Sequence, residues 1–86
     1  MQVKDIAPKL RRAIMLAREA GLVESAGELE ARAFAAYTTS SEWLGEVGVA
    51  IRRLLSRERA RVPAEAAELL NECLAEVGKV WPNLRR

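Results

Sequence analysis

The stretch that decides the fold class is "PAEAAELLNECLAEVGKVWP", residues 63–82. Its apolar residues recur every three or four positions, which places them along one face of an α-helix with about 3.6 residues per turn. These residues are Ala66, Leu69, Leu70, Cys73, Leu74, Val77, Val80 and Trp81. Pro63 suits the first turn of a helix, and Pro82 ends the pattern. The spacing predicts a helix over 64–80 with a continuous apolar face that other helices must cover.

Three more amphipathic segments precede this one. Their apolar periodicity predicts helices over 5–20, 26–37 and 41–60. Gly21 is placed to stop the first of them, and Ser25 with Glu28 has the spacing of a capping box at the start of the second. Because the connections are short, consecutive helices are expected to lie antiparallel. We predict an all-α fold, a compact antiparallel four-helix bundle-like domain that occupies residues 1–86.

Composition limits the classes of protein to consider. The chain has 86 residues, half of them hydrophobic, with 14 lysines and arginines against 12 aspartates and glutamates. A net charge of +2 from nearly balanced signs does not by itself imply a nucleic-acid partner. One cysteine excludes an internal disulfide, and no segment approaches the roughly 18 consecutive apolar residues of a membrane span. We therefore expect a cytoplasmic protein that acts without a membrane.

Side chains suited to catalysis are scarce. The sequence has no histidine, which excludes histidine-based acid–base and nucleophilic schemes. Cys73 lies within the apolar face of its helix and is predicted to be an unreactive core thiol. The carboxylates Glu65, Glu68, Glu72 and Glu76 are predicted to form a solvated row opposite that face rather than a metal site. We expect no enzyme, no catalytic or metal-binding residue and no cofactor.

The basic run "RRLLSRERAR", residues 52–61, is the strongest nucleic-acid signal in the chain. Its cations are Arg52, Arg53, Arg57, Arg59 and Arg61. Cations at the C-terminal end of a helix complement the helix dipole, and no aromatic side chains interleave with these arginines as a single-strand platform would require. A solvated helix end is the simpler interpretation, and a nucleic-acid-binding accessory protein is kept as an alternative hypothesis.

Two glycines and three apolar residues are not explained by the core pattern. Gly45 and Gly48 lie inside the predicted helix 41–60, where each glycine costs roughly 1 kcal/mol relative to alanine. Either the cost is tolerated, or a second backbone approaches there, from the same chain or from a partner. Val49 and Met15 lie opposite the apolar faces of their helices, and Phe34 lies at the edge of its own. We predict a candidate protein interface at these five residues, with a homodimer formed through the side of Gly45, Gly48 and Val49.

A third class of function is a helical bundle that binds a small molecule between its helices. Trp43, Tyr37 and Trp81 are the aromatic residues that would wall such a pocket. Buried aromatic residues are more often part of the core than of a ligand site. Protein–protein interaction, including self-association, is therefore the favoured function.

Overall fold

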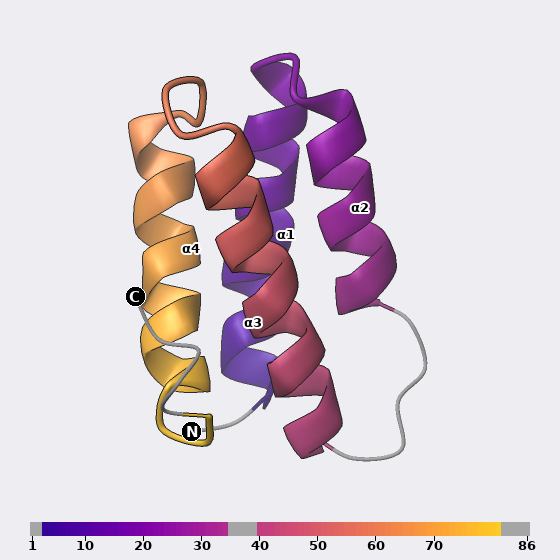
Figure 1. The fold of residues 1–86 in the computed structure, drawn as a ribbon, viewed down its shortest axis with the longest axis vertical. Coiled ribbons are helices and arrows are strands. Elements are labelled where there is room, and N and C mark those ends of the chain that lie inside the picture. The colour runs from indigo at the N-terminus through magenta and orange to yellow at the C-terminus, as the bar shows by residue number, and fades with distance from the viewer. Residues whose placement is uncertain (1–2, 35–39, 82–86) are drawn as a thin grey trace.

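The computed structural model describes residues 3–34 and 40–81. This part of the chain contains no strand and forms helices α1 (Val3–Glu19), α2 (Val23–Ala33), α3 (Ser40–Arg57) and α4 (Ala64–Val77). Successive helices run in opposite directions (Figure 1), and α1 and α3 each pack against both α2 and α4. The prediction of an all-α, antiparallel four-helix bundle is confirmed.

One hydrophobic core fills the space between the four helices. Its largest fully buried side chains come from every helix: Ile6, Leu10, Leu29, Val47, Ile51, Leu70, Cys73, Leu74 and Val77. All of them lie on the apolar faces that the periodicity predicts, because a three-to-four-residue repeat keeps one side of a helix inward along its length. Cys73 has no exposed surface, which confirms its prediction as a core residue.

The α1–α2 connection is built on Gly21, which was predicted to stop the first helix. Gly21 has a φ of +93°, a backbone conformation that glycine adopts without the steric cost of a Cβ atom. The amide of Leu22 then donates to the carbonyl of Ala17 at 3.0 Å, as at many helix C-termini. The turn is tight, and α2 begins at Val23, before its predicted start at residue 26.

This early start makes the predicted capping box wrong. Ser25 is inside α2, 3% exposed, and its hydroxyl donates to Glu58 Oε2 at 2.7 Å instead of to its own helix. Glu28 forms an ion pair with Arg57 of α3 at 2.9 Å. Both side chains that would form a local cap are thus used to join α2 to the end of α3.

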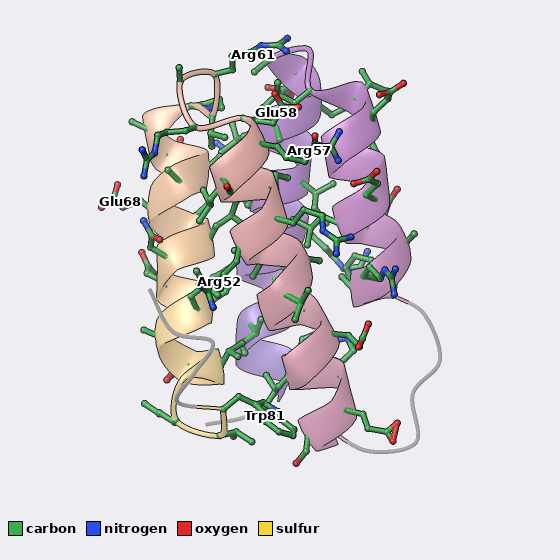
Figure 2. The ribbon with its side chains drawn as sticks, in the orientation of Figure 1. Arg52, Arg57, Glu58, Arg61, Glu68 and Trp81 are labelled. Carbon is green, nitrogen blue, oxygen red and sulfur yellow. The ribbon has the colours of Figure 1, made fainter. Side chains whose placement is uncertain are left out.

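The C-terminal end of α4 also differs from the prediction. The helix ends at Val77, so Val80 and Trp81 leave the core face and are 45% and 38% exposed. The amide of Trp81 donates to the carbonyl of Val77 at 2.8 Å, and the indole Nε1–H donates to the carbonyl of Ser41 in α3 at 2.8 Å. Trp81 therefore joins the end of α4 to the start of α3, where Figure 2 shows it.

Exposed ion pairs border the helix contacts. Lys9 pairs with Glu72 at 2.9 Å and Arg12 with Glu65 at 3.3 Å, both between α1 and α4. Glu65 and Glu72 of the predicted solvated row are thus exposed and also paired. Exposed pairs each contribute roughly 0–1 kcal/mol, so these two add little to the stability of the bundle.

Trp43 makes a buried polar link between α3 and the end of α2. Its indole Nε1–H donates to the carbonyl of Ala33, the last residue of α2, and the side chain is only 9% exposed. The last carbonyl groups of a helix have no partner within their own helix, and this hydrogen bond supplies a donor to one of them.

We expect Trp43→Phe to lower the free energy of unfolding by about 1–3 kcal/mol, because it leaves the Ala33 carbonyl without its donor. Urea denaturation followed by circular dichroism measures this change. Trp81→Phe is the matched control and should cost less, because its indole is more exposed. Equal losses in the two variants would contradict this account of Trp43.

Candidate functional site

Met15 and Phe34 lie together on the surface, although they are on different helices. They line a groove of about 540 Å³ between α1 and α2. The full lining is Arg11, Ile14, Met15, Arg18, Glu19, Glu30 and Phe34. Met15 is 43% exposed and Phe34 is 39% exposed, so two large apolar side chains face solvent in one hollow. We call this hollow the α1–α2 groove.

The charges of the α1–α2 groove are separated along its length. At one end the guanidinium carbon of Arg11 lies 4.3 Å from the centre of the Phe34 ring, within the range of a cation–π contact. At the other end Arg18 pairs with Glu30 at 3.0 Å, and Glu19 adds a second carboxylate. One end is therefore positive, and the other has two carboxylates against one guanidinium.

Val49 belongs to a different surface. Its side chain is 41% exposed and lines a smaller hollow of about 230 Å³ between α2 and α3. The other residues of this hollow include the ion pair of Arg32 with Glu46, 3.1 Å apart, and Arg53. The predicted interface residues therefore divide, with Met15 and Phe34 on one side of α2 and Val49 on the other.

The two glycines of α3 are covered from within the chain. A Cβ atom placed on Gly45 would lie 3.3 Å from Nε1 of Trp81 and 3.5 Å from its Cε2. Gly48 is buried. The second segment that approaches Gly45 is thus the stretch beyond the end of α4, through Trp81, and a partner chain is not needed to explain this glycine.

The arginines of residues 52–61 do not form one uniform patch. Arg57 pairs with Glu28 of α2, and Arg61 lies 3.6 Å from Glu58 and close to the Gly21 turn. In Figure 2, Arg52 points to the α4 side of α3 and Arg57 to the α2 side. Acidic partners and the helical twist therefore divide the positive charge that is contiguous in the sequence.

The remaining predicted residues do not gather into a site. Trp43 is in the core, Trp81 packs on Gly45, and Tyr37 lies outside the described residues. Within 3–34 and 40–81, no group of three or more cysteines and carboxylates is placed to hold a metal ion. Glu68 points outward from α4 (Figure 2). Among the same residues no helix is both long and apolar enough to cross a membrane.

The thiol of Cys73 is a poor nucleophile in the folded protein. Burial in the apolar core raises the pKa of its thiol to about 11, although Lys9 lowers it slightly. The thiolate is the reactive form of cysteine, and the neutral thiol dominates well above physiological pH in this environment. Cys73 therefore contributes to packing.

We expect alanine to have different effects at two helical glycines. Gly27→Ala should raise the free energy of unfolding by about 0.5–1 kcal/mol, because a Cβ atom there has no neighbour within 4 Å. Gly45→Ala should raise the free energy of unfolding by less, because the Trp81 indole has to shift to make room for the added Cβ atom. The two indole N–H signals in a ¹H–¹⁵N spectrum report this shift, and an unmoved Trp81 signal would contradict the contact.

We expect Cys73 to make the stability of the protein fall between pH 9 and pH 11. Below pH 9.0, the ordinary value of the thiol pKa, both states are protonated; between pH 9.0 and about 11 the unfolded state loses its proton first. Unfolding is then favoured by about 1–3 kcal/mol as the pH rises. Urea titrations of the wild type and of Cys73→Ala isolate this effect, and parallel pH profiles would exclude it.

No protein-family model, curated protein or solved structure matches this chain. The function must therefore be argued from the surface of the bundle itself. In the α1–α2 groove, two large exposed apolar side chains, Met15 and Phe34, share one hollow with charged side chains.

Proposed function

We propose that this protein acts by binding another protein through the α1–α2 groove. The observation that carries the proposal is the shared hollow of Met15 and Phe34, which is more than twice the volume of the hollow beside Val49. Burial of a side chain such as Met or Phe contributes about 1.5–3 kcal/mol relative to leaving it exposed. Two such residues side by side are a small but adequate centre for an interface.

The residue types in the groove support a protein partner. Methionine, aromatic residues and arginine are enriched in protein interfaces, and methionine adapts its shape to the surface it meets. The charged residues Arg11, Arg18, Glu19 and Glu30 border the apolar centre as a polar rim does. The described groove lining has no thiol or hydroxyl nucleophile, which makes binding a better proposal than catalysis.

A nucleic-acid partner is less well supported. Binding to phosphates requires cations that are free to replace counterions. Arg57 is already paired with Glu28, and Arg61 lies near Glu58. The proposal of a protein partner therefore takes precedence over the arginine-rich run.

The test is a comparison of three baits in affinity capture from the native cell. Wild type and Val23→Glu should retain the same bound protein, and Met15→Glu should lose it at least about tenfold, because a carboxylate would be buried in an apolar contact. Val23 is the matched control, since it is 59% exposed at the start of α2 and does not line the groove.

Circular dichroism confirms that each bait is folded, as expected for substitutions at exposed positions. Equal capture of the bound protein by Met15→Glu and by wild type would refute the groove as the binding surface.

A further inference from the structure

We infer that the protein bound in the α1–α2 groove is a second copy of the same chain, placed with its α1 antiparallel to the first. The inference rests on the proposed function and identifies its partner. It is carried by the order of charges along α1, where Arg11 and Glu19 lie one turn before and one turn after Met15.

An antiparallel pair of helices with a two-fold axis at Met15 brings opposite charges together. The axis places Met15 against Met15 of the partner subunit. It also places residues at equal distances before and after Met15 opposite one another. Arg11 then faces Glu19 of the partner subunit, and the symmetric contact repeats the same pair. The same rule places Arg18 opposite Arg12 of the partner subunit, but each of these arginines already pairs with a carboxylate of its own chain, Arg18 with Glu30 at 3.0 Å and Arg12 with Glu65 at 3.3 Å. One surface thus supplies an apolar centre and two complementary charge pairs between Arg11 and Glu19.

The groove residues at the α2 side are arranged to match those of α1. Phe34 lies beside Arg11, and Glu30 lies beside Arg18, because α2 runs antiparallel to α1. The two-fold rotation therefore brings the end with two carboxylates onto the end with Arg11 and Phe34. A parallel arrangement would instead place Arg11 on Arg11 and Glu19 on Glu19, which is repulsive.

Sedimentation of the full chain over a range of concentrations tests the inference. The wild type should shift from monomer to dimer as the concentration rises through the micromolar range. Arg11→Glu alone and Glu19→Arg alone should each weaken the dimer at least about tenfold, because each creates two like-charge contacts in the homodimer. Both variants lie on exposed positions and are expected to remain folded.

Mixing the two single variants is the decisive step. In the mixed dimer every contact is again between opposite charges, so an equimolar mixture should dimerise at the concentration at which each variant alone is a monomer. The chain with Met15→Cys and Cys73→Ala should also form an interchain disulfide on mild oxidation. The chain with Val23→Cys and Cys73→Ala should not.

A wild-type chain that stays monomeric at all concentrations would overturn the self-association. The proposed function would still be decided separately, by the capture experiment with Met15→Glu. The antiparallel arrangement would be overturned if both single variants dimerise as strongly as the wild type. It would also be overturned if mixing the two variants does not restore the dimer. Loss of capture by Met15→Glu together with a monomeric wild type would assign the groove to a different protein.

Discussion

The bundle depends on how its shortest helix, α2, is held in place. Only Leu29 among the buried residues of α2 is large; the others are Ser25, Ala26 and Ala33. Small side chains allow α2 to lie close to its neighbours but bury little apolar area. Polar links compensate at both ends, where Ser25 donates to Glu58 and Trp43 donates to the carbonyl of Ala33.

The apolar repeat was sufficient to predict the helices, their order and most of the core. The prediction failed at residues whose side chains contact a residue far away in the chain. Ser25 has the spacing of a cap, but its hydroxyl is used by Glu58, which is 33 residues away in the chain. Trp81 fits the stripe of α4, but it lies beyond the end of that helix and packs on Gly45. Neither contact can be predicted from a stretch of sequence as short as one or two helical turns.

Two apolar members of the candidate site, Met15 and Phe34, could be predicted from the sequence, but their grouping could not. A helical wheel identifies Met15 and Val49 as apolar residues outside the core, and both are exposed. It cannot say how one helix is rotated relative to the next, and that rotation brings Met15 to Phe34 and leaves Val49 on the other side of α2. Arg11 joins the candidate site because Phe34 lies beside it in the fold.

Self-association and the small apolar burial of α2 are physically connected. A domain of this size buries a modest fraction of its surface, and small domains commonly gain stability by associating. A second copy in the α1–α2 groove would cover Phe34 at the end of α2, the helix that contributes least to the core. Any ligand that binds only the folded state stabilises it by mass action. A partner bound in the α1–α2 groove would therefore add contacts to the helix that buries the fewest large apolar side chains.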